Sequence, residues 1–96
     1  MVVNNLLIKL KQRDADSLAK AVSVLQQLKG NIPVLLDSHV ETNVGQGTAA
    51  CDIMLINTFA ALEDIQDYLV HPVHMEVSDY IKDKIDTAAS LCYEVK

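Results

Sequence analysis

The chain has 96 residues, of which half are hydrophobic, and a formal net charge of −5 at pH 7. This length fits a single domain over residues 1–96, and the apolar fraction predicts an ordered core rather than a disordered chain. Nucleic-acid binding depends on clustered Lys and Arg, whereas the eight basic residues here are scattered, so we expect no nucleic-acid partner.

The sequence also lacks the patterns of membrane and secreted proteins. No apolar run approaches the roughly twenty residues that span a bilayer, and "MVVNNLLIKLK" is too interrupted for a signal peptide. Cys51 and Cys92 lie far apart, each inside an expected strand, and buried free thiols are the better interpretation of both. We therefore expect a cytoplasmic protein that does not bind membranes.

Two segments of the first half alternate as β-strands do. Residues 2–11 form the first strand, with Val3, Asn5, Leu7 and Lys9 on one face and Leu6, Ile8 and Leu10 on the other. Residues 32–44 form the second, which has one polar face that carries Leu35, Asp37, His39 and Glu41. The opposite face is expected to carry Leu36, Ser38, Val40, Thr42 and Val44.

One helix and one turn complete this half. Residues 14–30 place apolar side chains at three- and four-residue spacings, which predicts an amphipathic helix. Asp14 or Asp16 can cap its start, and Gly30 can end it. The segment "GQGTAA" at 45–50 predicts a turn, because its two glycines can take backbone angles that other residues avoid.

The second half predicts a third strand, two helices and a fourth strand. Residues 51–59 form the third strand. A short helix is expected over about 61–69 and a longer one over about 72–86, where Pro72 suits the first turn. Residues 90–95 close the chain as a strand. This order is the β-α-β-β-α-β arrangement of a ferredoxin-like α+β sandwich, with a four-stranded antiparallel sheet and all helices on one face.

The sheet face that the helices leave uncovered is expected to be apolar. Val3, Leu7, Met54, Ile56 and several residues of the second strand lie on it. They recur on three neighbouring strands and would merge into one patch, which usually marks an interface. Burying one such side chain is worth roughly 1.5–3 kcal/mol, so covering the patch contributes a free energy comparable with the stability of a whole domain. We therefore predict a homodimer in which two sheets pack face to face.

Three segments resemble a known family, the stress-responsive α/β-barrel domain proteins. They are "VVNNLLIKLK", "LKGNIPVLLD" and above all "IQDYLVHPVH". That family shows a tyrosine and then His-Pro-x-His between its second and third helices, and a tyrosine in its last strand, as Tyr93 is here. The resemblance covers nearly the whole chain and implies a dimeric α+β barrel. Members include stress-associated proteins and cofactor-free polyketide cyclases.

The cyclase members imply roles for two residues of the motif. Their last motif histidine acts as a general base and their tyrosine anchors or polarises the substrate, and these roles correspond to His74 and Tyr68. Neutral imidazole can take a proton beside a carbonyl, and a phenol can donate a hydrogen bond to the enolate oxygen. The expected cavity also includes Asn4, Ile53 and His71. Cyclase members have histidines where Asn4 and Ile53 stand, and neither of these residues can act as a base.

Two other interpretations of residues 68–74 stay open. In a structural one, His71 and His74 cap the next helix and wedge the two helices apart, while Tyr68 packs beneath them. In a metal-binding one, the two histidines are spaced to bind zinc, with Glu76 and Asp79 as the only local candidates for further ligands. We expect no metal, because a closed zinc site needs a full set of ligands.

The leading hypothesis is a homodimer that binds a small apolar or aromatic molecule between helices and sheet, or serves a stress response without turnover. The alternative is a cofactor-independent cyclase or isomerase with His74 as base and Tyr68 as hydrogen-bond donor. That enzyme needs an open cavity reached by both side chains and Asn4. It loses its site if Leu6, Ile8 and Ile53 fill the space.

Overall fold

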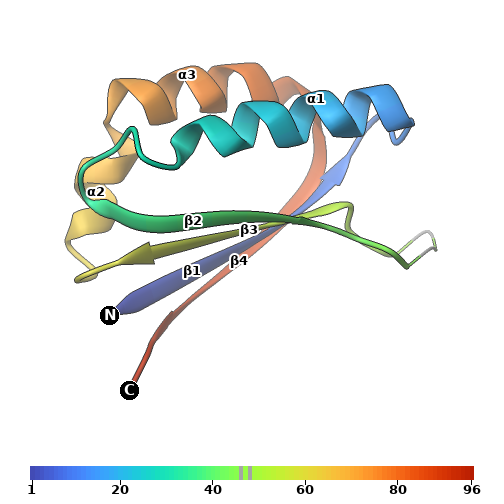
Figure 1. Cartoon of the computed structure of the whole chain (residues 1–96). Coiled ribbons are helices and arrows are strands. Elements are labelled where there is room, and N and C mark those ends of the chain that lie inside the picture. The colour runs from blue at the N-terminus through green and yellow to red at the C-terminus, as the bar shows by residue number, and fades with distance from the viewer. Residues whose placement is uncertain (46, 48) are drawn as a thin grey trace.

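The chain folds into one antiparallel sheet with its helices on one face (Figure 1). The computed structural model describes residues 1–45, 47 and 49–96. The elements, in chain order, are β1 (Val2–Leu10), α1 (Ala15–Leu25), η1 (Gln26–Leu28), β2 (Leu35–Thr42), β3 (Ile53–Phe59), α2 (Asp64–Leu69), α3 (Pro72–Ile81), η2 (Lys82–Lys84) and β4 (Ile85–Glu94). The strand order is β2-β3-β1-β4, and each pairing is antiparallel. The predicted ferredoxin-like α+β sandwich is confirmed.

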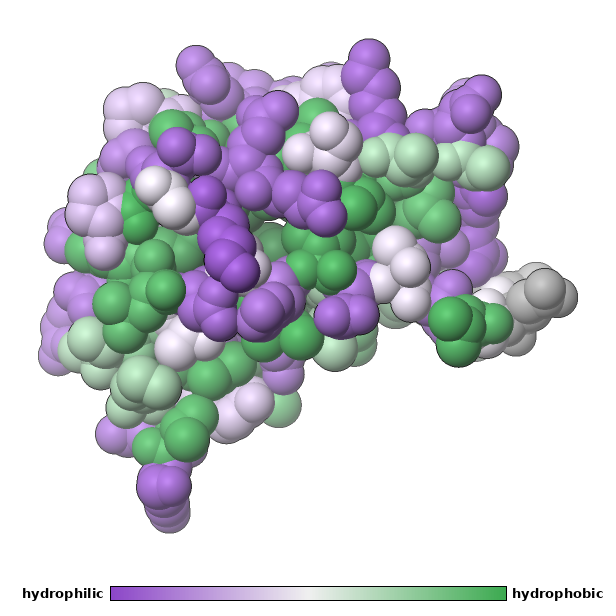
Figure 2. Space-filling view, viewed as in Figure 1, coloured by the Kyte–Doolittle hydropathy of each residue, from purple (hydrophilic) through white to green (hydrophobic). Residues whose placement is uncertain are grey.

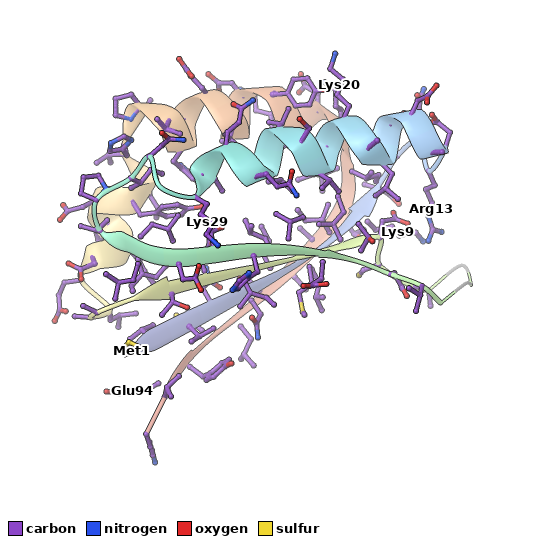
Figure 3. The ribbon with its side chains drawn as sticks, viewed as in Figure 1. Met1, Lys9, Arg13, Lys20, Lys29 and Glu94 are labelled. Carbon is purple, nitrogen blue, oxygen red and sulfur yellow. The ribbon has the colours of Figure 1, made fainter. Side chains whose placement is uncertain are left out.

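The core lies between the sheet and the helix layer, where side chains fill the space (Figure 3). Ile8 of β1 faces Ile53 of β3 in register, and both are buried completely, as is Phe59 at the other end of β3. From above, α1 and η1 contribute Leu25 and Leu28. These contacts between distant segments hold the helices against the three strands β2, β3 and β1.

Local signals in the sequence explain how α1 begins and how its segment ends. The Asp14 carboxylate accepts hydrogen bonds from the Ser17 backbone N–H at 3.0 Å and from the Ser17 hydroxyl at 2.7 Å. These two bonds lower the pKa of Asp14, and the carboxylate caps the helix as expected. After η1 the chain turns at Gly30, whose φ of 80° suits a residue without a Cβ.

The expected faces of the second strand are wrong at its start. A register shift between Leu35 and Asp37 indicates a β-bulge, which turns Leu35 toward the helices beside Ser38 and Val40. Leu36 is left exposed instead. Beyond this strand, Gly47 has a φ of 143°, as a glycine turn predicts, while Gln46 and Thr48 of the expected turn lie outside the described residues.

The last helix is shorter and the last strand longer than predicted. α3 ends at Ile81, and β4 already begins at Ile85, opposite Leu10 of β1. Pairing with β1 along its whole length overrides the weak helical pattern of residues 82–86. β4 is an edge strand without a helix over it, so Cys92 is exposed and the expectation of a buried thiol there is wrong. Cys51 is half-buried, precedes β3 and is also free.

The side of the sheet away from the helices, here called the outer face, is apolar over β3, β1 and β4. The expected contribution of the second strand is wrong, because the bulge in β2 leaves Asp37, His39 and Glu41 on this face. Its apolar residues are Val3 and Leu7 of β1, Met54 and Ile56 of β3, and Ala89, Leu91 and Tyr93 of β4. Leu7 is 40% exposed, Leu91 66% and Tyr93 45%. Apolar surface, drawn in green, borders the C-terminal part of β4 low in Figure 2. In the described part of the chain, no helix is both long and apolar enough to span a membrane.

Candidate functional site

A line of polar side chains crosses the helix-facing side of the sheet. In the strand register, Asn57 of β3 lies opposite Ser38 of β2 on one side and Asn4 of β1 on the other, and Asn4 lies opposite Cys92 of β4. We call these four residues the polar row. Ser38 and Asn57 are only 5% and 3% exposed. Asn4 is half-buried and Cys92 is exposed on the edge strand β4, so Ser38 and Asn57 form the buried part of the row. Polar groups buried in an apolar core must be hydrogen-bonded internally or to a bound molecule.

Hydrogen bonds connect half of the polar row to Tyr68 of α2. The Ser38 hydroxyl donates to Asn57 Oδ1 at 2.7 Å, and Asn57 Nδ2 donates to the Tyr68 hydroxyl oxygen at 3.1 Å. Burial raises the pKa of Tyr68 to about 12, against the smaller opposing effect of the Asn57 bond. Tyr68 is therefore neutral at physiological pH, and its own hydrogen can still be donated.

His74 of α3 lies against Tyr68, with ring centroids 4.5 Å apart. His74 Nδ1 is 3.0 Å from the backbone carbonyl oxygen of Leu69. A carbonyl can only accept, so Nδ1 carries the proton and donates, and in the neutral ring Nε2 is the unprotonated nitrogen. The ring is thus oriented by the backbone with one nitrogen able to accept a proton or a hydrogen bond.

His71 uses its Nδ1 atom as an acceptor, whereas His74 uses its Nδ1 atom as a donor. His71 Nδ1 accepts a hydrogen bond at 3.1 Å from the backbone N–H of Val73, and this residue is the N-cap of α3 ahead of Pro72. The capping interpretation is therefore confirmed for His71. His74 does not cap the helix start, because its bond goes back to Leu69 in α2. It ties the two helices together across the break.

Asn4 lies near the Tyr68–His74 pair, whereas Ile53 lies away from it in the packed core. The Oδ1 atom of Asn4 is buried and has no hydrogen-bond partner among the described residues. It lies beside Asn57, which is bonded to Tyr68, so Asn4, Tyr68 and His74 belong to one neighbourhood. Ile53 lies further along β3, opposite Ile8, where both side chains fill the core. The space at the Ile53 end is therefore occupied.

Sequence reasoning missed Asn57 as a site residue and placed Ser38 only on a face. A signal for Asn57 was present, because it interrupts the series Ile53, Leu55 and Phe59 at a position that should be apolar. Ser38 carried the same kind of signal, because it stands between Leu36 and Val40 on the expected face. The bulge exchanges Leu36 for Leu35 but leaves Ser38 between two apolar side chains.

A pocket lies at the β2 end of the polar row. A pocket of about 320 Å³ is lined by Gln26, Lys29, Ser38, His39 and Val40, so it reaches the Ser38 end of the row. Beside it, the Asp37 carboxylate contacts Lys29 at 3.4 Å and His39 at 2.9 Å. Within the described residues, no three His, Cys, Asp or Glu side chains are grouped to hold a metal ion.

A family model matches nearly the whole chain and agrees with this fold. The model of the stress responsive A/B barrel domain family matches residues 4–95, and the chain belongs to that family. No protein with a curated description matches the chain.

Solved structures share the fold along nearly the whole chain. A dimeric protein of unknown function and ferredoxin-like fold from Bacteroides fragilis is 22% identical with a TM-score of 0.83, and the match covers 98% of this chain and 95% of that one. A dimeric ferredoxin-like protein of unknown function from Thermobifida fusca is 15% identical with a TM-score of 0.85, covering 98% and 90%. A hydroxynitrile lyase from Passiflora edulis is 13% identical with a TM-score of 0.83, covering 99% and 93%.

Proposed function

We propose that this protein acts as a homodimer whose two sheets pack through their outer faces. The exposed apolar side chains Leu7, Leu91 and Tyr93 support this pairing, because a patch of that kind is stabilised by contact with a partner. Asn5 on the same face has a buried Oδ1 atom without a partner among the described residues, and a second copy could supply the donor. The Bacteroides fragilis and Thermobifida fusca structures are described as dimeric.

Within each subunit, we propose that a small aromatic or apolar molecule binds between the polar row and the helix pair α2–α3. The unpartnered Oδ1 atom of Asn4 carries this proposal. Leaving a buried acceptor unpaired costs about 1–3 kcal/mol, and a hydroxyl on the bound molecule would remove that cost. The Tyr68 hydrogen and the His74 Nε2 atom could serve further polar groups of the same molecule. Because Ile8 and Ile53 are fully buried, we place the molecule at the Tyr68 end.

The pair p-cresol and toluene tests this site, because the two molecules differ by one hydroxyl group. We expect NMR titration to show several-fold tighter binding of p-cresol, with shifts centred on Asn57 and its neighbours. Asn4→Ala should abolish the preference. Asn31→Ala is the matched control, since it removes the same kind of side chain from an exposed position after η1 and should keep the preference. Equal binding of both molecules to the wild-type protein would contradict the proposal.

A second candidate is a cofactor-independent enzyme, and the orientation of His74 supports it. The Leu69 carbonyl bond leaves Nε2 as the basic nitrogen, and the adjacent Tyr68 remains a hydrogen-bond donor. The buried Ile8 and Ile53 count against a full cyclase site, because they fill the volume that a large substrate would need. Turnover of polyketide-like compounds by the wild type, lost in His74→Ala with folding retained, would favour the enzyme. Binding without turnover in either protein would favour the binding function.

We further propose that the protein works in the cytoplasm. Cys51 and the exposed Cys92 are both free, which suits a compartment that keeps thiols reduced. Fluorescence microscopy of a tagged full-length chain tests the location, and a purely extracellular signal would contradict it.

A further inference from the structure

α1 begins and α3 ends at the end of the helix layer away from α2 (Figure 1). A separate cleft is lined by residues from these two helix ends, the end of β1 and η2. Its volume is about 430 Å³, and small-molecule sites typically have roughly 300–1,000 Å³. The buried side chains of Leu10 and Ala21 contribute apolar surface to it. Neither the polar row nor Tyr68 lines this cleft, so it is distinct from the site above.

Two lysines approach one aromatic ring in this cleft. The Lys84 ammonium group lies 4.0 Å from the centroid of the Tyr80 ring and donates a hydrogen bond to the Tyr80 carbonyl oxygen at 3.0 Å. The Lys20 ammonium group lies 5.9 Å from the same centroid, and Lys20 projects from α1 on the side away from the sheet (Figure 3). The cation–π contact with the Tyr80 ring and the hydrogen bond to the Tyr80 carbonyl oxygen hold the Lys84 ammonium group in place before a ligand binds.

A third lysine is held beside this pair by the backbone. The Lys11 N–H donates to the Lys84 carbonyl oxygen at 2.9 Å, which brings the end of β1 next to η2. The cleft also carries Asp16 and Asp83, so three positive and two negative groups leave a formal charge of +1 in a chain of −5. In the part of the chain that the structure describes, none of the three ammonium groups is within ion-pair distance of a carboxylate.

We propose that this cleft binds a small aromatic anion, such as an aryl carboxylate. The carboxylate would contact the ammonium groups of Lys20 and Lys84, and the aromatic body would lie on Tyr80, Leu10 and Ala21. The lysines outnumber the carboxylates in the cleft, so an anion is attracted to it and neutralises the remaining positive charge. The ring surface and the aliphatic stems of the lysines supply the apolar contacts for the rest of the molecule.

The proposal is tested with 1-naphthoate and its uncharged analogue 1-naphthalenemethanol. We expect NMR titration to show naphthoate binding, with shifts at Lys20 and Tyr80, and much weaker binding of the alcohol. The double variant Lys20→Met with Lys84→Met should weaken naphthoate binding about tenfold. Lys82→Met is the matched control, because Lys82 pairs with Asp79 outside the cleft and should leave the affinity unchanged.

Three results would overturn this inference. The first is equal affinity for naphthoate and the alcohol, which would remove the role of charge. The second is an unchanged affinity in the double variant, or naphthoate shifts centred on Asn57 and Tyr68 instead of Tyr80. The third is binding of inorganic phosphate as tight as that of naphthoate, which would remove the role of the ring. If the double variant does not fold, the wild-type affinity must fall as salt is raised from 0.05 to 0.5 M, since these charges are exposed to screening.

Discussion

Asn57 bonds two parts of the molecule at once: its amide nitrogen donates to the Tyr68 hydroxyl at 3.1 Å, and its amide oxygen accepts from the Ser38 hydroxyl at 2.7 Å. One side chain on β3 thereby joins the edge strand β2 to the helix α2. All three side chains are buried. Breaking either hydrogen bond therefore lowers stability, because it leaves a buried polar group without a partner.

Asn57→Leu should therefore lower the free energy of unfolding by about 1–3 kcal/mol, because it leaves the Ser38 and Tyr68 hydroxyls without this partner. Urea denaturation measures the change. The triple variant with Ser38→Ala, Asn57→Leu and Tyr68→Phe removes all three polar groups together. It should lose less stability than the sum of the three single variants. A full additive loss would show that these residues act independently.

Tyr68 should make stability depend on pH in the alkaline range. Its pKa in the folded chain is raised to about 12 by burial, above the ordinary value of 10 in the unfolded chain. The folded state thus favours the protonated phenol, and this stabilisation is complete below pH 10 and is lost as the pH rises toward 12. Urea unfolding between pH 9 and 11.5 should show a decline that is smaller in Tyr68→Phe. The same decline in both proteins would contradict the assignment to Tyr68.

The fold was accessible from the sequence because its signals are local and repeated. Alternation in β1 and β3, helical spacing in α1 and the Asp14 cap each occur where the pattern predicts them. The pattern failed where long-range pairing decides the structure. The bulge at Leu35 and the early start of β4 at Ile85 both depend on the strand alongside, which a single segment does not reveal.

The site was only partly accessible, for a related reason. The motif at 68–74 pointed to Tyr68 and His74, and the structure places their rings in contact. Asn57 is eleven residues from Tyr68 in sequence, and no local sequence pattern predicts the hydrogen bond between their side chains. Ile53 came from the family resemblance, and its complete burial opposite Ile8 separates it from the polar groups.

The proposed dimer predicts that a charge on the outer face dissociates the protein. Leu7→Asp places a carboxylate in the apolar patch, where it must be desolvated on assembly, and should give a monomer. Sedimentation equilibrium should give about twice the chain mass of 10.6 kDa for the wild type. Leu62→Asp is the matched control, since Leu62 is also an exposed leucine but precedes α2, away from the sheet. A monomeric wild type at micromolar concentration would contradict the dimer.

The His71 cap predicts a stability effect that depends on the acceptor atom and not on the ring. His71 Nδ1 accepts from the Val73 N–H, one of the helix-start donors that have no partner within the helix. His71→Ala should lower the free energy of unfolding by about 1 kcal/mol, whereas His71→Ser should retain most of the stability because serine is a good N-cap residue. Urea denaturation of the three proteins measures both differences. If serine destabilises the protein as much as alanine, the packing of the imidazole rather than the cap is what matters at this position.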